Sequence, residues 1–483
     1  MTAKKSIKKN YLYNLAYQIL TVLVPFVTIP YLSRVLGVEN IGINSFTLSI
    51  VTYFVLLANI GVTSFGTREI ALHQDDRKKY SKIFWDLYSY QFLVGVISIL
   101  AYSIYVFCLG GYPSVQWIMM LNIVAAVFDI VWLYQGLEDY KYISVRNILI
   151  KLIAVAATFT FVRTADDLWI YVLINSMATV VSACFLWLKF PKIADKPKFR
   201  EIRIFHYWKD TFIYFLPQIA VSIYTVLDKT MLGIITGSEA ENGYYDQTYK
   251  VIQIALIILI SLNTVVAPRM AYLFGKGKKE EIKKRLKTSF HFIYLIAFPL
   301  VFGLIAIGPD FSSLFFGEGY EKVRILLPLF APIILVISIS NCLSGQCLIP
   351  TGKQKQAAIF LWVGAASNFI LNLFTITFFS SIGAAISSII AEIIITTSFI
   401  ILAREYVKPS TIFVVMKNYL IAGAFMLIEL LVINHFWQGI TIPVIAAKIL
   451  IGGLSYMFVL RFILRDTFLT SEVGAVIRKF LHR

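Results

Sequence analysis

Three basic side chains lie in or beside long apolar runs, where a charge needs a special reason. They are Arg34, Lys229 and Lys250, and the carboxylate of Asp228 directly precedes one of them. An ionised group in hydrocarbon is costly, so such a residue usually faces a polar cavity or an opposite charge. We predict that the three cations face a cavity and attract an anionic ligand, with Asp228 as their ion-pair partner. A purely structural ion pair, or long side chains that reach back to water, would explain the same pattern.

Two further carboxylates lie inside apolar runs, Asp129 and Glu392. A lone carboxylate in a membrane must find a partner or take a proton. Asp129, Asp228 and Glu392 are therefore candidates for binding H+ or Na+, and a hydrogen bond between helices is the alternative. Lys448 is expected either to reach water or to meet Glu429.

The composition indicates a polytopic membrane protein. Of 483 residues, 58% are hydrophobic and only 15% are charged, too few polar groups to cover a soluble globule of this size. The net charge of +17 does not indicate nucleic-acid binding, because Lys and Arg lie between the apolar runs, where they would meet water and lipid headgroups. We expect an all-α fold with about fourteen transmembrane helices. The runs are 11–32, 41–65, 85–109, 115–135, 148–163, 168–188, 210–235, 244–266, 290–308, 324–349, 357–379, 381–403, 413–435 and 441–463.

The distribution of basic residues predicts the orientation. If the N-terminus is cytoplasmic, nearly all of the 44 Lys and Arg residues fall in cytoplasmic segments, and the positive-inside rule places both termini in the cytoplasm. Arg68, Arg146, Lys151 and Arg269 then lie at cytoplasmic helix ends, where this rule alone explains them. They could also contact an anionic ligand that enters from that side. The exceptions to the rule are Arg34, Arg163, Lys229, Lys250, Lys322, Arg324 and Lys448.

A basic segment, residues 191–209, follows the sixth run and divides the chain. We expect lobes at 1–190 and 210–403, joined by this cytoplasmic linker, and a C-terminal part at 404–483. The lobes show weak internal similarity: Arg34-Val-Leu-Gly37 precedes Gly42-Ile-Asn-Ser-Phe46, as Thr230-Met-Leu-Gly233 precedes Gly243-Tyr-Tyr-Asp-Gln247. Each span corresponds to the span six later, which implies a parallel two-fold repeat of the kind found in transporters.

Several motifs carry a family resemblance: Asn10-Tyr-Leu-Tyr-Asn14, Pro30-Tyr-Leu-Ser-Arg-Val-Leu-Gly37, Phe65-Gly-Thr-Arg68-Glu69, Leu227-Asp-Lys-Thr-Met-Leu-Gly233, Gly243-Tyr-Tyr245 and Pro268-Arg269. With them the chain resembles the bacterial polysaccharide transporter family, which comprises O-antigen and capsule repeat-unit flippases of the multidrug/oligosaccharidyl-lipid/polysaccharide exporter superfamily. The resemblance implies two pseudo-symmetric six-helix lobes, two further C-terminal helices and a central cavity that opens alternately to each side.

The same resemblance implies the cargo, an undecaprenyl-diphosphate-linked oligosaccharide carried from the inner to the outer leaflet of the bacterial plasma membrane. It also implies membrane lipids, and the polymerase and chain-length machinery of polysaccharide synthesis, as partners. In that setting the cavity cations would attract the diphosphate.

The sequence lacks the motifs of the main enzyme classes. It contains no G-x-x-x-x-G-K-[ST] phosphate loop, no HExxH and no GxSxG, so we expect no enzyme activity, metal or cofactor, and coupling to H+, Na+ or the membrane potential. A cation-coupled multidrug exporter of the same superfamily is an alternative, but it would favour acidic cavity residues. A membrane-bound polymerase or glycosyltransferase is another, but it usually carries a large outer loop, and the outer segments here are short.

Overall fold

The computed structural model describes residues 7–197, 199–466 and 468–469. Across these ranges the chain is helical and contains no β-strand, which confirms the all-α prediction. The helices form two compact units, one of Met1–Gly233 with Ser238–Gly243 and the other of Ile234–Gly237 with Tyr244–Arg483. The contacts thus group most of the seventh predicted span with the first unit, while the division at the linker remains a prediction.

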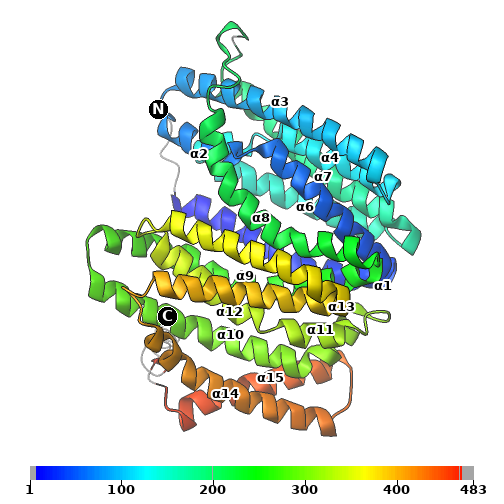
Figure 1. The fold of residues 1–483 in the computed structure, drawn as a ribbon, viewed down its shortest axis with the longest axis vertical. Helices are drawn as coiled ribbons and strands as arrows, with labels where there is room; N and C mark the ends of the chain where they lie inside the picture. Colours follow the sequence, from blue (N-terminus) through cyan, green and yellow to red (C-terminus); the bar gives the residue numbers. More distant parts are fainter. Residues whose placement is uncertain (1–6, 198, 467, 470–483) are drawn as a thin grey trace. The chain divides into compact units, whose positions relative to one another are not determined.

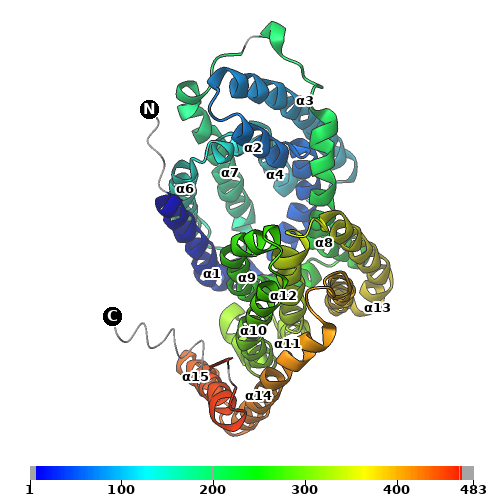
Figure 2. The same cartoon turned by 90° about the vertical axis from the view of Figure 1, so that its left-hand side faces the viewer.

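The first unit encloses an interior between helices of the N-terminal half. α4 packs against α7, and α1 packs against α3, α4 and α6. Figure 1 shows α3, α4, α6 and α7 running side by side, and Figure 2 shows the same group after a quarter turn. The elements are α1 (Ile7–Asn59), α2 (Val62–Leu72), α3 (Arg77–Leu109), α4 (Pro113–Phe128), α5 (Val131–Gly136), α6 (Tyr140–Phe161), η1 (Ala165–Asp167), α7 (Leu168–Ile193), η2 (Phe199–Glu201) and most of α8 (Trp208–Thr236).

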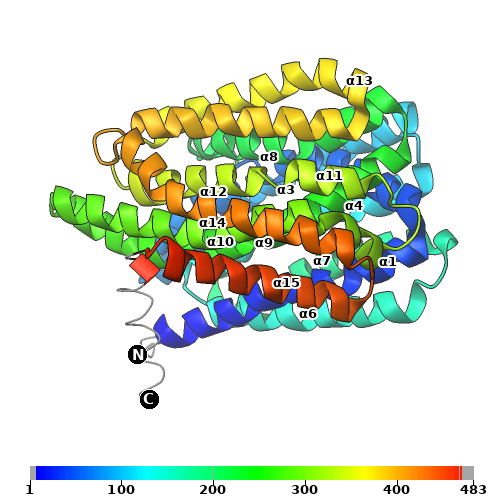
Figure 3. The ribbon, with the colours of Figure 1, turned by 90° about the horizontal axis from the view of Figure 1, so that it is seen from below.

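In the second unit, the last two long helices pack on α10 and on each other, an arrangement that Figure 3 shows from below. The elements are most of α9 (Glu239–Gly275), α10 (Lys279–Phe316), α11 (Val323–Phe330), α12 (Ile333–Leu343), the π-helix η3 (Ser344–Leu348), α13 (Gln354–Leu402), α14 (Pro409–Phe436), α15 (Ile442–Phe458) and the π-helix η4 (Val459–Ile463).

Each of the fourteen predicted runs lies mostly on helix in the structure, and three of them are interrupted by two residues, at 60–61, 129–130 and 331–332. Ten helices of the described chain are long and apolar enough to cross a membrane, or eleven if the bent helix α9 is one span. The number is smaller than fourteen because α1 and α13 each contain two runs, and because α8, which holds the seventh run, is not among the helices counted. α1 and α13 are each interrupted at one residue with positive φ, Gly37 at 75° and Ser380 at 51°. The two halves of α13 are also joined by a 2.6 Å hydrogen bond between the hydroxyls of Thr375 and Ser387. The multi-pass prediction is therefore confirmed.

Two glycines of the sequence motifs, Gly42 and Gly66, lie where helices approach closely. A Cβ atom on Gly42 would lie 3.0 Å from the backbone nitrogen of Gly243 and would overlap the carbonyl of Glu239. A Cβ atom on Gly66 would lie 2.6 Å from the ring of Trp132, where α2 packs against α5. A side chain at either position would collide with its neighbours, so packing explains these two glycines, whereas Gly37 has open space around it and a positive φ of 75°.

One sequence expectation is wrong. Lys448 neither reaches water nor meets Glu429: it is 0% exposed, and its Nζ lies 2.9 Å from Asp310 Oδ2. The sequence placed Asp310 in an outer segment after a span ending at 308. In the structure α10 continues to Phe316, so the carboxylate lies on the helix against which α15 packs.

Candidate functional site

The fourth predicted span is interrupted inside the first unit. α4 and α5 are separated by two residues, although the sequence reads there as one apolar run. Such a break leaves backbone groups that lipid cannot satisfy. Gln91 of α3 meets them: its Nε2 donates to the carbonyl oxygens of Ala126 (2.7 Å) and Asp129 (3.0 Å), and its Oε1 accepts from Trp132 Nε1 (3.1 Å). One buried side chain thus binds both halves of the broken span.

The break also positions the carboxylate of Asp129. Trp187 of α7 donates from Nε1 to the carbonyl oxygen of Phe128 at 2.8 Å, which fixes the end of α4. Asp129 Oδ1 accepts from the Val131 backbone N–H at 2.8 Å and so caps the start of α5. Because the residue lies where the chain leaves the helix, its side chain reaches a cavity instead of a neighbouring helix.

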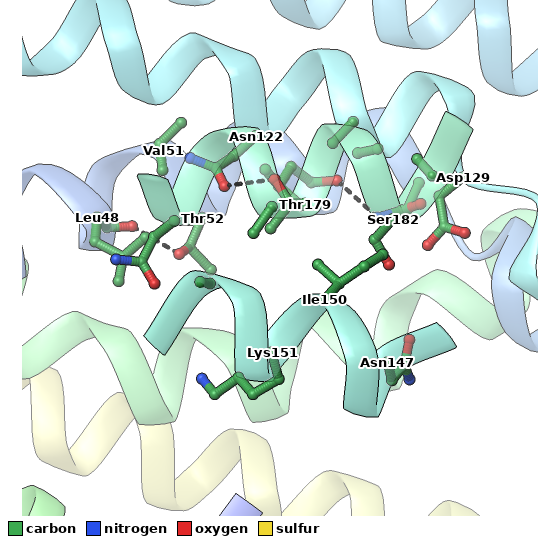
Figure 4. Close-up of a pocket in the computed structure, with 18 of the residues that line it drawn as sticks. Leu48, Val51, Thr52, Asn122, Asp129, Asn147, Ile150, Lys151, Thr179 and Ser182 are labelled. Carbon is green, nitrogen blue, oxygen red and sulfur yellow. Dashed lines mark hydrogen bonds between the residues drawn. The ribbon is translucent and has the colours of Figure 1, made fainter. Parts of the chain in front are cut away.

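This cavity, of about 480 Å³, lies between α1, α4, α6 and α7. Figure 4 shows Asp129 and Asn147 toward one end and Thr52 toward the other, while Asn122 and Thr179 lie across from Ile150 and Lys151. The polar part of its wall comprises Thr52, Asn59, Asn122, Asp129, Arg146, Asn147, Lys151, Asn175, Thr179 and Ser182. The structure therefore brings together Asp129, Arg146 and Lys151, which the sequence had suggested for separate roles.

The two cations of the cavity differ in how they are held. Arg146 is 6% exposed, donates from Nη1 to the Ser182 carbonyl at 2.8 Å and from Nη2 to Asn147 Oδ1 at 2.7 Å, and interacts electrostatically with Asp129. Lys151 is exposed to the cavity, and its ammonium has neither a hydrogen bond nor an ion pair within the described chain. With two cations and one carboxylate, the cavity carries a net positive charge, and Lys151 is available to a ligand.

The neutral wall of the cavity was missed by the sequence reasoning. Asn122 Nδ2 donates to Ser176 Oγ at 2.9 Å, and Thr179 Oγ1 donates to Asn122 Oδ1 at 3.2 Å, so this amide joins α4 to α7. Single Asn and Thr residues hardly change the hydropathy of a run and therefore drew no notice. A usable signal was the spacing of seven residues between polar positions within the same predicted run, as between Asn122 and Asp129.

The predicted cavity cations lie in different units. Arg34 is exposed and donates from Nη1 to the Pro30 carbonyl at 3.0 Å, on α1. On α8, Asp228 is buried and Lys229 half-buried, and the Lys229 carbonyl accepts a bond from Asn242 Nδ2. Lys250 belongs to the second unit. That the three cations gather around one ligand stays a prediction.

In the second unit, the predicted residues Lys250, Glu392 and Arg269 lie at three separate places. Lys250 forms an ion pair of 2.6 Å with the buried Asp246, one turn earlier on α9, a partner that the sequence reasoning missed. Glu392 is buried on α13. Arg269 lies 3.5 Å from Glu281 and over the ring of Tyr272, at the end of α9.

Of the remaining predicted residues, Arg68 is exposed on α2 in the first unit. Among the described residues, no cluster of three or more His, Cys, Asp or Glu side chains could hold a metal ion.

Comparison with known proteins places the chain in a family. The family model described as "Polysaccharide biosynthesis protein" matches residues 7–274, more than half of the chain, and the model "MatE" matches residues 214–374. A protein of Escherichia coli (strain K12) named "Putative O-antigen transporter" is 25% identical over 418 residues, which is 84% of this chain and 98% of the relative. A Haloferax volcanii protein named "Probable low-salt glycan biosynthesis flippase Agl15" is 22% identical over half of each chain. These relatives are named as transporters or flippases, not as enzymes.

Solved structures share the fold. The structure titled "Lipid II flippase MurJ, inward closed conformation" aligns with a TM-score of 0.71 at 16% identity, covering 95% of this chain and 99% of that one. The eukaryotic MATE transporter AtDTX14 aligns with a TM-score of 0.53 at 13% identity, covering 86% of this chain and 97% of that one. Together with the family models, these likenesses lead to one conclusion: the chain belongs to the polysaccharide biosynthesis protein family of the multidrug/oligosaccharidyl-lipid/polysaccharide exporter superfamily.

Proposed function

We propose that this protein is a flippase for undecaprenyl-diphosphate-linked oligosaccharide repeat units. It moves them from the inner to the outer leaflet of the bacterial plasma membrane by alternating access, for the synthesis of a cell-surface polysaccharide. The membership of the family, and relatives named as O-antigen transporter and glycan flippase, support a lipid-linked cargo. The positive charge of the cavity supports an anionic, diphosphate-linked headgroup as the transported part.

One observation carries the proposal: a net positive cavity of about 480 Å³ lies among helices whose outer faces are apolar. The obstacle to flipping is the transfer of a charged, hydroxylated headgroup through hydrocarbon, where an ionised group is strongly disfavoured. Fixed cations such as Lys151 lower that barrier for a diphosphate, because they replace the attraction that water and counterions supply outside the membrane. An ammonium without a protein partner is suited to this role.

The charge of the cavity also argues against the main alternative. A multidrug exporter that carries organic cations would need carboxylates around its cargo, whereas here Arg146 and Lys151 outnumber Asp129. Asp129 is then a candidate for coupling to H+ or Na+, as are Asp228 and Glu392 elsewhere in the chain. The loading role of Arg68 and Arg269, a diphosphate role of Arg34, Lys229 and Lys250, and contact with polymerase or chain-length proteins belong to the same proposal.

The orientation completes the proposal. Both termini are cytoplasmic on the positive-inside rule, which puts the N-terminal end of α6, with Arg146, on the side where the cargo is made. Labelling of single cysteines engineered at positions 138 and 166, in the segments at opposite ends of α6, tests this in a variant whose four native cysteines are replaced by alanine. With a membrane-impermeant maleimide and intact spheroplasts, only position 166 should react.

A flipping assay with the purified full-length protein in liposomes tests the function. The substrate is a fluorescent undecaprenyl-diphosphate-linked oligosaccharide, and the readout is the fraction that an added reagent can reach over time. We expect wild type to speed flipping well above protein-free liposomes. Lys151→Ala should slow it by about tenfold, the value of one charge-assisted hydrogen bond. If liposomes with the wild-type protein flip the lipid no faster than protein-free liposomes, the proposal is overturned.

The matched control is Lys284→Ala. Lys284 is exposed near the start of α10, and its ammonium has no partner within the described chain, so its loss should leave flipping unchanged. Lys353 is less suitable, because its Nζ donates to the Leu402 carbonyl at 2.9 Å and supports the end of α13. Arg34→Ala and Lys250→Ala, tested beside Lys151→Ala, show which predicted cations contribute. Repeating the assay with imposed pH or Na+ gradients tests the coupling ion.

A further inference from the structure

The polar residues of the first unit's cavity repeat at a spacing of seven along three helices. The pairs are Thr52 and Asn59 on α1, Asn122 and Asp129 along α4 and at its end, and Asn175 and Ser182 on α7. Seven residues are nearly two full turns, so the members of a pair share a helix face about 10.5 Å apart. The cavity wall therefore has two levels. We call Asn59, Asp129, Arg146 and Ser182 the charged tier, and Thr52, Asn122 and Asn175 the neutral tier.

Each tier has its own contacts between helices. In the charged tier, Arg146 binds the Ser182 carbonyl and lies in the field of Asp129. In the neutral tier, Asn122 is fixed by Ser176 and Thr179 of α7. Lys151 lies one helical turn from Asn147 and so between the two tiers, and Figure 4 shows Asp129 and Thr52 toward opposite ends of the cavity.

Several side chains that line the cavity donate a hydrogen bond to a backbone carbonyl of their own helix. Thr52 Oγ1 donates to the Leu48 carbonyl at 2.7 Å, Asn59 Nδ2 to Val55 at 3.2 Å, and Asn175 Nδ2 to Tyr171 at 2.8 Å. The amide oxygens of Asn59 and Asn175 accept no hydrogen bond within the described chain. These groups thus present acceptors to the cavity, where the donors of a ligand can reach them.

The acceptors and the ammonium group that the wall presents to the cavity indicate the chemistry of a ligand. The amide oxygens and the Thr52 hydroxyl call for hydrogen-bond donors without positive charge, since Arg146 and Lys151 would repel a cation. The Lys151 ammonium calls for an anionic acceptor. A molecule with a polyhydroxylated part and an anionic part satisfies both at once, whereas an anion alone would leave the neutral tier unmet.

We propose that the neutral tier is a carbohydrate-binding subsite that reads the sugar part of the cargo, while Lys151 and the charged tier hold its phosphate part. This inference rests on the proposed function and makes it more specific: Thr52 and Asn175 determine preference for the glycan, and Lys151 determines affinity for any lipid phosphate. Asn122 is a positioning residue that keeps α4 and α7 at the spacing the subsite requires.

Binding of two probes to the full-length protein in nanodiscs tests this division. The probes are undecaprenyl diphosphate and undecaprenyl diphosphate that carries a neutral disaccharide, and the readout is the ratio of their dissociation constants. Wild type should prefer the glycosylated probe. Asn175→Leu and Thr52→Val should each reduce that preference by about three- to tenfold, the effect of one lost hydrogen bond, without changing affinity for the bare lipid. Lys151→Met should weaken both probes equally.

Thr160→Val is the matched control. Thr160 of α6 makes the same kind of bond, from Oγ1 to the Ala156 carbonyl at 2.8 Å, but does not line the cavity, so its variant should keep the wild-type ratio. Unchanged thermal unfolding of each variant verifies folding.

The subsite is overturned, and the flippase proposal is not, if wild type flips the lipid-linked glycan while Asn175→Leu and Thr52→Val keep the full preference. A wild type with equal affinity for both probes also overturns the subsite. If wild type neither binds nor flips either lipid, both proposals fail.

Discussion

Replacing Gln91 by leucine is the sharpest perturbation of the structure that supports the cavity. The residue is 1% exposed, and its amide contacts two carbonyls of the α4 end and the indole of α5. Leucine has a similar size but no polar atom, so it keeps the packing and removes three hydrogen bonds. The carbonyls of Ala126 and Asp129 and the Nε1 of Trp132 then stay buried without this partner.

The magnitude follows from those three groups. An unsatisfied buried donor or acceptor costs about 1–3 kcal/mol, and all three belong to one network, so simple addition gives an upper bound. We expect Gln91→Leu to lower the free energy of unfolding by roughly 3–6 kcal/mol if no water reaches the break. Because the same bonds fix the end of α4, the direction of the Asp129 side chain should change as well.

Thermal unfolding in detergent and the liposome flipping assay measure the two effects. Gln91→Glu distinguishes the contributions of the two kinds of hydrogen bond, because glutamate keeps an oxygen that accepts from Trp132 Nε1 but loses the donor to the two carbonyls. Gln116→Leu is the matched control: Gln116 is equally buried, but its Oε1 accepts only a long bond of 3.4 Å from the Tyr112 amide and bridges no break. Gln91→Leu with the unfolding temperature and flipping rate of wild type would refute the idea that this side chain holds the broken span.

Two further changes test the packing of each unit. Gly66→Val should destabilise the protein by about 1–3 kcal/mol, because the new side chain overlaps the Trp132 ring. Gly453→Ala, with nothing within 4 Å of its Cβ, should leave the unfolding temperature near that of wild type. If the two variants unfold at the same temperature, Gly66 is not in close contact with Trp132. Lys448→Met should lower the free energy of unfolding by up to about 3–5 kcal/mol, because it leaves Asp310 without its cation. Adding Asp310→Asn to that variant should recover most of this loss. A double-mutant cycle measured by chemical denaturation in which the two losses simply add would show that the two side chains do not interact.

The positions of the helices could be predicted from the sequence, because lipid imposes a simple rule. A span must be apolar over about 20 residues, and the fourteen runs found in this way all lie on helices. The interruptions were only partly predicted. Gly37 and Ser380 fall between predicted runs, but the break before Val131 lies inside a run, because Asp129 is the single charge in a stretch that is apolar on both sides of it.

The candidate site was predicted in part for the same physical reason. A charge inside a span or at its end stands out, so Asp129 was noticed within a span and Arg146 and Lys151 at cytoplasmic helix ends, although only the fold places them in one cavity. Neutral residues such as Asn175 did not stand out, because one amide changes mean hydropathy little. Lys448 shows the opposite error: the charge was noticed, but its partner Asp310 was assigned to an outer segment because the apolar run was taken to end at residue 308, whereas α10 continues to Phe316.

The residues that shape the cavity and those that read a ligand in it are separate sets, and this separation has a consequence for specificity. Gln91 and Trp187 meet the carbonyls of the broken span from outside the cavity, whereas Thr52 and Asn175 face the cavity and bond only to their own helices. A change in the second set alters the groups offered to a ligand without exposing a buried backbone group, so its cost in stability is small. A change in the first set alters both. Variants at Thr52 and Asn175 should therefore change which glycan is bound at nearly constant unfolding temperature, and variants at Gln91 should not.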